Sequence, residues 1–287
     1  MVATATIAIS CKGDKGSAWE LPAPGEKEPE PPVIIDESIT VDKRCEKTGN
    51  VLNLATYNVG VFNKSGSNSM EMISKMMKEW NLDALSLNEL DSCNTRSGLS
   101  VNQLKDFAKV MGNWNWNFAA AISYKSGKYG IGVVTPLEIK DRWTISLPFV
   151  DDKEYRAVSV VETEKFVFCS CHLGLTVNAQ LGQIDVMNKF MKSHFDGYKK
   201  PVFFCGDMNA EPHMDAIKKL QEDWTTLSVT DDTTFSTSNP VKCIDYIFLY
   251  KTAAQVKVKT SFVGKSFKYG DPKTASDHFP VFVQVEL

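Results

Sequence analysis

The chain has 287 residues, of which 43% are hydrophobic and 23% are charged, and its formal net charge is −3. Because 32 lysine and arginine residues stand against 35 aspartate and glutamate residues, the composition argues against a protein that holds nucleic acid mainly through a strongly positive surface. No stretch approaches the ~20 apolar residues of a membrane-spanning helix, and seven scattered cysteines without a CxxC pair argue against a disulfide-built miniature fold or a zinc ribbon.

Residues 1–18 are interpreted as a truncated signal or lipoprotein anchor. The run from Ala8 to Cys11 resembles a bacterial lipoprotein box, although Ala8 stands where leucine is usual. A lipid on Cys11 would tether the protein, so an exported or membrane-tethered location, periplasmic or at the cell surface, is slightly favoured over a cytoplasmic one. The alternative is a frayed N-terminus or an expression remnant, because so short a motif often occurs by chance.

Residues 19–46 are interpreted as a linker rich in proline and glutamate. Five of the twelve prolines fall between Pro22 and Pro32, interleaved with glutamates. Such a segment has little apolar surface to bury and stays extended. Residues 47–287 then remain for one folded domain, which is long enough to bury a large core.

From Val51 onward, strand-like and helix-like segments alternate along the chain. Apolar residues at helical spacing predict helices over 69–80, 101–111 and 181–191. Apolar or alternating runs predict strands over 51–58, 82–90, 118–123, 130–135, 157–162, 166–173, 201–209, 243–250, 256–263 and 278–287. This alternation predicts an α/β domain, and no internal repeat is visible.

Polar residues recur where the predicted strands end. They are Asn58, Glu89, His172, Asp207, Asn209, Asp245, Asp277 and His278. If these ends converge on one rim of a sheet, their carboxylates and amides are costly to bury unless they are paired or bound to a cation. An oxygen-rich set of this kind suits a hard cation such as Mg²⁺ better than zinc.

Seven short motifs occur in a fixed order along the chain. They are TYNV, LNEL, YGIGVV, CHLG, GDMNAEP, IDYIF and SDHFPV. In this order they resemble the motif set of the endonuclease/exonuclease/phosphatase family, from about Val51 to Leu287. The resemblance implies a DNase I-like four-layer sandwich for residues 47–287, in which two mixed β-sheets pack face to face and are flanked by helices, an α/β (α+β) fold.

The resemblance also implies a metal site. Glu89 would bind a catalytic Mg²⁺, or Mn²⁺ in its place, with Asn58 beside it and Asp277 completing or supporting the position. A divalent cation lowers the barrier to attack on a phosphate diester by several kcal/mol, because the anionic oxygens otherwise repel nucleophiles.

The same resemblance assigns the proton-transfer residues. His278 would be the general base or a phosphate-contacting imidazole, oriented by a hydrogen bond to Asp245. Asp207 and Asn209 would align the attacking water and the scissile phosphate. Independently of the family, an imidazole with an ordinary pKa of ~6.5 can take a proton from water at neutral pH if a carboxylate fixes its tautomer.

Two residues are assigned to the phosphate in addition to Asn209. His172 would donate to a phosphoryl oxygen or to the leaving group. Arg156 resembles the family's phosphate-clamping arginine, whose planar fork can hold two phosphate oxygens as a lysine cannot.

Each assignment has a structural alternative. Asn58 could cap a turn, and Glu89 could lie in a solvated loop. Cys169, Cys171 and Cys205 fit small core residues of strands, while an exported protein could pair Cys205 with one of the other two.

Two positions depart from the family pattern. Asn88 stands where glutamine usually precedes the metal-binding glutamate, which would alter the support of the site without removing the ligand. Gln180 stands near the place of an arginine that follows the HL motif, so a second phosphate contact is not expected there.

The substrate class is left open among phosphate esters, because this fold serves nucleases, inositol phosphatases and sphingomyelinases. Nucleic acid, a phospholipid headgroup or a small phosphodiester would fit. Loops over 94–96 and 113–129 offer aromatic and cationic side chains for a base, sugar or headgroup, or else their tryptophans plug the core. These side chains are Arg96, Trp114, Trp116, Tyr124, Lys125, Lys128 and Tyr129.

The sequence therefore predicts a divalent-metal-dependent phosphodiester hydrolase, nuclease-like or acting on a lipid headgroup. The alternatives are a phosphomonoesterase of the inositol-phosphatase type and a non-catalytic module that binds a phosphate ligand. No partner protein is inferred.

Overall fold

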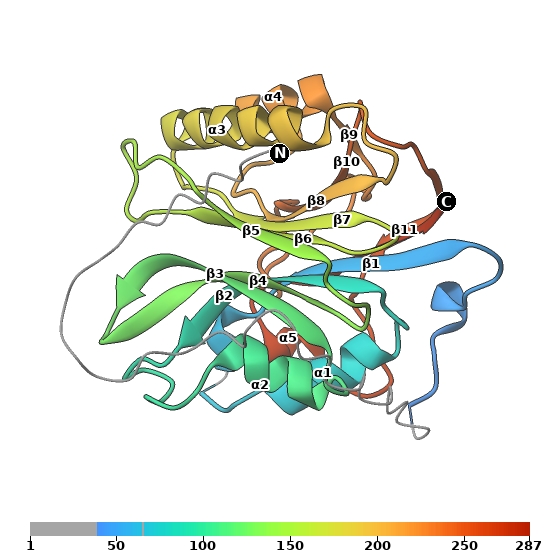
Figure 1. Ribbon diagram of the computed structural model, residues 1–287. Coiled ribbons are helices and arrows are strands. Elements are labelled where there is room, and N and C mark those ends of the chain that lie inside the picture. Colours follow the sequence, from blue (N-terminus) through green and yellow to red (C-terminus); the bar gives the residue numbers. More distant parts are fainter. Residues whose placement is uncertain (1–38, 65) are drawn as a thin grey trace. The chain divides into compact units, whose positions relative to one another are not determined.

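The computed structural model describes residues 39–64 and 66–287, shown in Figure 1. The interpretation of residues 1–18, with Cys11, and most of the predicted linker lie outside the described residues. Within the described linker residues, a short 3₁₀ helix (Lys43–Cys45) places Cys45 fully in the core. Across the described part of the chain, no helix combines the length and apolar character needed to cross a membrane.

The first sheet has six strands in the order β11-β12-β1-β2-β4-β3. Their bounds are β1 (Val51–Asn58), β2 (Ala84–Ser92), β3 (Asn115–Tyr124), β4 (Gly127–Thr135), β11 (Lys257–Val263) and β12 (Val281–Glu286). β1 runs parallel to β2 and antiparallel to β12, so the sheet is mixed.

The second sheet also has six strands, in the order β5-β6-β7-β8-β10-β9. Their bounds are β5 (Asp141–Ser146), β6 (Ala157–Glu162), β7 (Val167–His172), β8 (Val202–Asp207), β9 (Trp224–Thr226) and β10 (Asp245–Tyr250). β7 and β8 are parallel, and the other pairs are antiparallel. The two mixed sheets confirm the predicted α/β sandwich.

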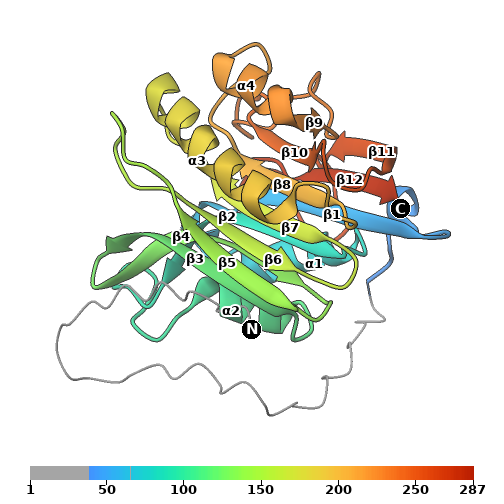
Figure 2. The same cartoon turned by 45° about the horizontal axis from the view of Figure 1, so that its top comes forward.

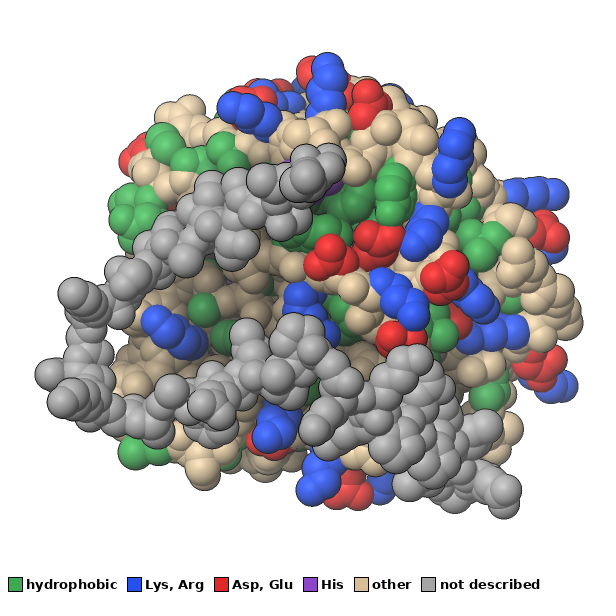
Figure 3. All heavy atoms as spheres, in the orientation of Figure 1, with side chains coloured by type: hydrophobic (Ala, Val, Ile, Leu, Met, Phe, Trp, Pro, Cys, Tyr) green, Lys and Arg blue, Asp and Glu red, His purple; other side chains and the backbone are tan. Residues whose placement is uncertain are grey.

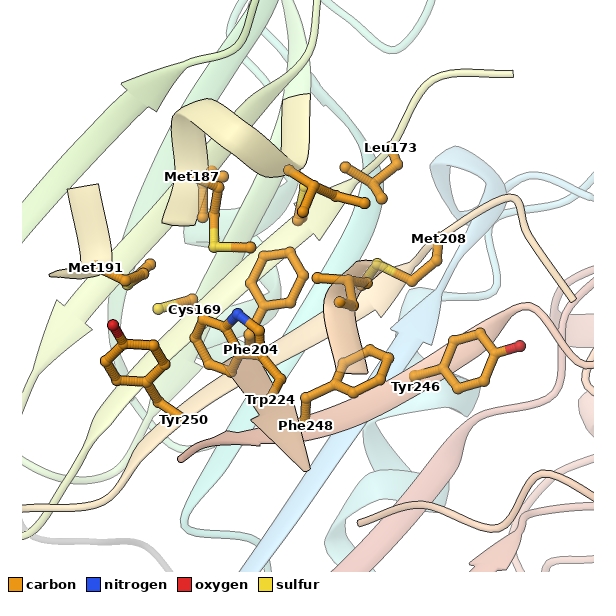
Figure 4. Packing of buried hydrophobic residues seen from close by; sticks show 14 of the residues in the cluster. Cys169, Leu173, Met187, Met191, Phe204, Met208, Trp224, Tyr246, Phe248 and Tyr250 are labelled. Carbon is orange, nitrogen blue, oxygen red and sulfur yellow. The ribbon is translucent and has the colours of Figure 1, made fainter. Parts of the chain in front are cut away.

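Helices cover the outer face of each sheet (Figures 1 and 2). Their bounds are α1 (Met70–Lys78), α2 (Gln103–Val110), α3 (Val177–Phe195), α4 (Asp215–Asp223) and α5 (Pro272–Ala275). Under α3 and α4, one core joins helix residues such as Met187 and Leu220 to outward-facing strand residues such as Phe204 and Phe248 (Figure 4). A second core lies between α1, α2 and the first sheet, where Ile73, Met76 and Met77 use the helical spacing seen in the sequence.

The inner faces of the two sheets meet in a third core. It contains alternate residues of the strands, including Leu52 and Leu54 of β1, because successive side chains of a strand point to opposite faces. Further along the same face the contact becomes polar: Ser86 Oγ donates to Ser170 Oγ across the sheets at 2.8 Å, and Thr56 Oγ1 donates to Ser86 Oγ at 3.2 Å. Continuing this alternation to the strand ends brings polar side chains from both sheets together.

Candidate active site

Strand alternation and register assemble the predicted site at one end of the inner faces. Asn58 follows Leu52, Leu54 and Thr56 on the inner face of β1. In the second sheet, the register pairs His172 with Asp207 and Asp207 with Asp245, which places three predicted site residues in one row across β7, β8 and β10.

A β-bulge turns Glu89 toward this rim. Between Leu87 and Leu90, β2 advances three residues while its partner β4 advances two, from Gly132 to Gly130. The extra residue keeps Leu90 with Leu87 in the helix-side core, so Asn88 and Glu89 are both free to face the other sheet. Glu89 has a φ of 59°, a left-handed conformation that costs about 1–3 kcal/mol in a non-glycine residue and recurs at functional sites.

Hydrogen bonds connect the two sheets through Asp207. Asn58 Nδ2 donates to Glu89 Oε1 and to Asp207 Oδ2, both at 3.1 Å. Asp245 Oδ2 lies 2.9 Å from His278 Nδ1, and His278 Nε2 lies 3.6 Å from Asp207 Oδ2. The structure therefore contains the contact through which Asp245 was predicted to orient His278.

Two of the predicted phosphate-contacting residues, His172 and Asn209, contact the carboxylate of Asp207, whereas Arg156 pairs with Glu154. His172 Nε2 lies 3.5 Å from Asp207 Oδ2, and the backbone N–H of Asn209 donates to Asp207 Oδ1 at 2.9 Å. Arg156 immediately precedes β6 and is buried, with an N–H pointing to Glu154 at 2.7 Å. Asn209 Nδ2 donates to the carbonyl of Leu173, which fixes the loop after β8 to the loop after β7.

These residues line one cavity of about 340 Å³. The predicted site residues in its wall are Glu89, Arg156, His172, Asp207, Asn209, Asp277 and His278. Asn58 and Asp245 are fully buried and support the wall through the hydrogen bonds given above. All nine predicted positions thus come together, while the role of each residue stays a prediction.

Buried polar atoms without partners mark the site as one prepared for a ligand. Among the described residues, His172 Nδ1, Asp245 Oδ1 and Arg156 Nε are buried without a hydrogen-bond partner. Most buried polar atoms in proteins are paired, so the unpaired nitrogen atoms of His172 and Arg156, which line the cavity, indicate groups that a bound molecule would satisfy.

The charge states follow from burial and from neighbouring carboxylates. Burial raises the pKa of Glu89, and it raises that of Asp207 to about 7. Burial alone would lower the pKa of His278, but Asp245 and Asp207 outweigh it and raise the pKa to about 10. Burial and the nearby Arg156 lower the pKa of His172 well below its usual value. These directions favour the protonated form of His278 and the neutral form of His172.

The residues present fit a hard divalent cation. Glu89 is desolvated and, among the described residues, accepts one hydrogen bond, from Asn58, so its carboxylate has coordination capacity toward the cavity. Asp277 also lines the cavity, and its Oδ2 is paired with Lys64 Nζ at 2.6 Å, which leaves Oδ1 as the oxygen for a cation. Ligand atoms of Asp207, Asp245 and His278 also lie within 4.8 Å of one another, but His278 Nδ1 is used in the hydrogen bond to Asp245.

The prediction that residues 113–129 form a loop is wrong, because most of them belong to the hairpin of β3 and β4. The aromatic and cationic side chains named there divide into two groups. Trp114 and Trp116 pack against the core of the first sheet, which confirms the structural alternative for them. Tyr129 lines the cavity, and the Arg96 guanidinium stacks over Tyr124 and Tyr129 while it forms a two-point ion pair with Asp91. Cys169, Cys171 and Cys205 are buried free thiols, as expected for small core residues.

Two supporting residues could not be assigned their contacts from sequence. Ser276 Oγ donates to the carbonyl of Asn58 at 2.6 Å and accepts from the backbone N–H of His278, so it ties β1 to the SDH motif. Asn88, noted only as a departure from the family, donates to the carbonyl of Cys171 at 2.8 Å and accepts from the backbone N–H of Asp207 at 3.1 Å. Asn88 therefore bridges the sheets directly beside Glu89.

Replacing Asn88 by leucine should lower the free energy of unfolding by about 2–4 kcal/mol, because one buried carbonyl and one buried N–H lose their partner. Chemical denaturation measures the change. The same substitution at exposed Asn239 should leave stability within about 0.5 kcal/mol. Equal, small effects at both positions would contradict the bridge.

Gln180 takes a structural role in place of the absent arginine. From α3, its buried Nε2 lies within 3.4 Å of the carbonyls of Gly174, Met208 and Asn209. Gln183, one turn on, accepts from the backbone N–H of Gly174 at 2.8 Å. Together the two amides hold the loop that follows His172 and the loop that carries Asn209.

Replacing Gln180 by methionine, which has similar length but no N–H donor, should reduce kcat on a phosphate ester about tenfold, because misplaced catalytic groups are costly. The cation concentration for half-maximal activity should stay unchanged, since Gln180 touches none of the predicted metal ligands. Gln221→Met on exposed α4 is the control. A shift in cation dependence without a change in kcat would show that Gln180 does not position these loops.

Comparison with known proteins agrees with this geometry. Residues 55–278 match the model of the Endonuclease/Exonuclease/phosphatase family, whose members hydrolyse phosphoesters. A comparison with curated proteins gives no match.

Solved structures share the fold at low sequence identity. A family protein from Leptotrichia buccalis aligns with a TM-score of 0.67 and 18% identity over 82% of this chain and 100% of its own. A mannosyl-6-phosphatase from Bacteroides thetaiotaomicron aligns with a TM-score of 0.63 and 16% identity over 82% of this chain and 100% of its own. The human nocturnin catalytic domain with bound sulfate aligns with a TM-score of 0.62 and 16% identity over 83% of this chain and 93% of its own. With its ordered motifs gathered at one cavity, this chain belongs to the endonuclease/exonuclease/phosphatase family and is a phosphoester hydrolase.

Proposed function

We propose that the chain is a divalent-metal-dependent phosphodiesterase. The observation that carries this proposal is the convergence of Glu89, Asp207, His278 and Arg156 on one cavity. Glu89, with Asn58 and Asp277, would hold Mg²⁺ or Mn²⁺. The cation would supply charge stabilisation for the phosphate and the attacking oxygen.

Each side chain of the site has a separate role in this proposal. Arg156 and His278 would contact the anionic oxygens, since both line the cavity with N–H groups and the neighbouring Asp245 and Asp207 raise the pKa of His278. Asp207 and Asn209 would orient the attacking water, and His172 would donate to the leaving group. Asp245 would keep the His278 ring in place through its hydrogen bond.

The charge of the cavity favours a diester over a monoester. Five carboxylate residues line it, namely Glu89, Glu154, Asp207, Glu211 and Asp277, against the two permanent cations Arg156 and Lys242. The carboxylates exceed these cations by three charges, and one divalent cation would offset two of them, while His278 is paired with the buried Asp245. A monoanionic diester would then be repelled less than a dianionic monoester.

A phosphomonoesterase is the second candidate, because the mannosyl-6-phosphatase shares the fold over the whole of its chain. The assay that separates the two compares bis-(p-nitrophenyl) phosphate with p-nitrophenyl phosphate. The purified full chain is first treated with chelator and then supplied with Mg²⁺ or Mn²⁺.

We expect hydrolysis of the diester to stop with chelator and to return with either cation, and the monoester to react more slowly. Hydrolysis that persists in chelator would contradict the metal requirement, and faster turnover of the monoester would reverse the preference. Absence of turnover for both esters, together with a cation-dependent rise in Tm, would favour a binding module.

A further inference from the structure

Five large hydrophobic side chains stand in solvent beside the mouth of the cavity. Each is between 44% and 56% exposed, and together they are called the rim patch: Phe149, Val150, Tyr155, Leu175 and Val177. Figure 3 shows hydrophobic side chains gathered at the upper left, where Figure 1 draws the loop between β5 and β6. Other exposed large hydrophobic residues in the described chain are scattered: Leu99, Val110, Val186, Val241, Val258 and Leu287. Single exposed residues are ordinary, whereas a cluster indicates a binding surface.

The rim patch is formed by two loops that are bound to each other. Thr176 Oγ1 donates to the carbonyl of Asp151 at 2.8 Å, and the backbone N–H of Leu175 donates to Asp152 Oδ1 at 3.3 Å. Within the loop between β5 and β6, the rings of Phe149 and Tyr155 have centroids 4.7 Å apart. The patch is thus preformed, so a ligand would not have to order its two loops separately.

The rim patch continues into the cavity. Leu175 belongs to both, and the cavity wall also contains the apolar side chains of Met214 and Ile244. The loop that carries Phe149 and Tyr155 ends at Arg156, one of the two permanent cations of the cavity. The same short loop therefore carries both part of the rim patch and Arg156, the residue proposed to hold the phosphate.

We propose that the rim patch binds an apolar chain or ring attached to the scissile phosphate, which makes the substrate class an amphiphilic phosphodiester. This inference rests on the proposed function, because Arg156 and the cation would hold the phosphate in the cavity. The charged side chains that line the cavity are five carboxylates against Arg156 and Lys242, so the cavity presents no large basic field for a polyanion. Burial of the apolar group against Phe149 and Tyr155 supplies the recognition.

The test compares diesters that differ only in the length of one chain. Methyl p-nitrophenyl phosphate and octyl p-nitrophenyl phosphate are assayed below the critical micelle concentration of the octyl ester, with Mg²⁺. For the unmodified protein, kcat/KM should be at least about tenfold higher for the octyl ester, because methylene groups leave water on binding.

The double variant Phe149→Ser/Tyr155→Ser should bring this octyl-to-methyl ratio close to one. The control Val258→Ser removes an equally apolar, exposed side chain from β11 and should leave the ratio and the basal activity unchanged. An unaltered ratio in the double variant, or no chain-length preference in the unmodified protein, would overturn the proposal.

A binding measurement separates failure of the patch from failure of the catalytic proposal. Monomeric dodecylphosphocholine, titrated calorimetrically, should bind the unmodified protein and bind at least about tenfold more weakly to the double variant, whether or not any diester is hydrolysed. Equal binding to both would reject the patch even in an active enzyme.

Phosphatidylcholine vesicles then distinguish a single amphiphile from a bilayer as the source of the apolar group. Sedimentation with vesicles that is lost in the double variant supports the proposal with a bilayer as the source. Binding of monomeric dodecylphosphocholine without sedimentation supports a single amphiphile. Sedimentation that the double variant retains, without patch-dependent binding of the monomer, contradicts the proposal.

Discussion

Replacing Glu89 by glutamine should lower kcat for bis-(p-nitrophenyl) phosphate by about 10³-fold, since a cation-ligand interaction worth several kcal/mol is lost. The amide keeps the size of the side chain and its hydrogen-bonding capacity toward Asn58, so the fold should persist. In parallel, the rise in Tm caused by Mg²⁺ should become smaller, because ligand-induced stabilisation follows the affinity for the folded protein.

The matched control is Glu222→Gln, which removes one carboxylate from the exposed end of α4. It should leave kcat and the Mg²⁺ response unchanged. If Glu89→Gln retains most of its activity, Glu89 is not the principal metal ligand. The principal ligand would then be Asp207 or Asp277, the other carboxylates beside His278 in the cavity wall.

Replacing Gly206 by alanine should lower the free energy of unfolding by about 3–5 kcal/mol, the sum of a backbone and an overpacking penalty. Gly206 has a φ of 140°, and an added Cβ would lie only 1.8 Å from the carbonyl oxygen of Cys171 on the neighbouring strand. Urea denaturation measures the loss, and activity should fall with it because Asp207 follows directly in β8.

Gly197 provides the control for backbone conformation alone. It has a φ of 67°, but a Cβ there meets no atom within 4 Å. Gly197→Ala should therefore cost about 1–2 kcal/mol, the penalty of the left-handed conformation. Similar losses at both glycines would show that β7 and β8 can separate enough to admit the methyl group.

Polar residues at the ends of predicted strands indicated most of the site from sequence, because side chains along a strand alternate between two faces. In β1, β7, β8 and β10 the inner-face residues follow a strict alternation, so a polar residue at the end of an apolar strand falls on the inner rim. Helices of the outer layers could be predicted in the same way. In α1, for example, Ile73, Met76 and Met77 occur at helical spacing and pack against the sheet.

Other features depend on contacts that no local pattern encodes. By alternation alone, Glu89 would share the helix-side face of Leu85 and Leu87, and only the bulge in β2 redirects it. The hydrogen bonds of Asn88 join residues far apart in the sequence, so the sequence showed only that Asn88 departs from the family pattern and not that it bridges the two sheets. The rim patch was not predicted, because Phe149, Tyr155 and Leu175 read as ordinary loop residues until the two loops are placed side by side.

The placement of β12 also determines when the lining of the cavity is complete. The second sheet comes from one continuous segment, whereas β12 is inserted beside β1 in a sheet whose first four strands precede that segment. Asp277 and His278 lie just before β12, so they reach the cavity only after β1 to β11 have left the ribosome. A nascent chain can fold its earlier elements, as domains do during synthesis, but its cavity lacks these two residues until β12 has joined the first sheet.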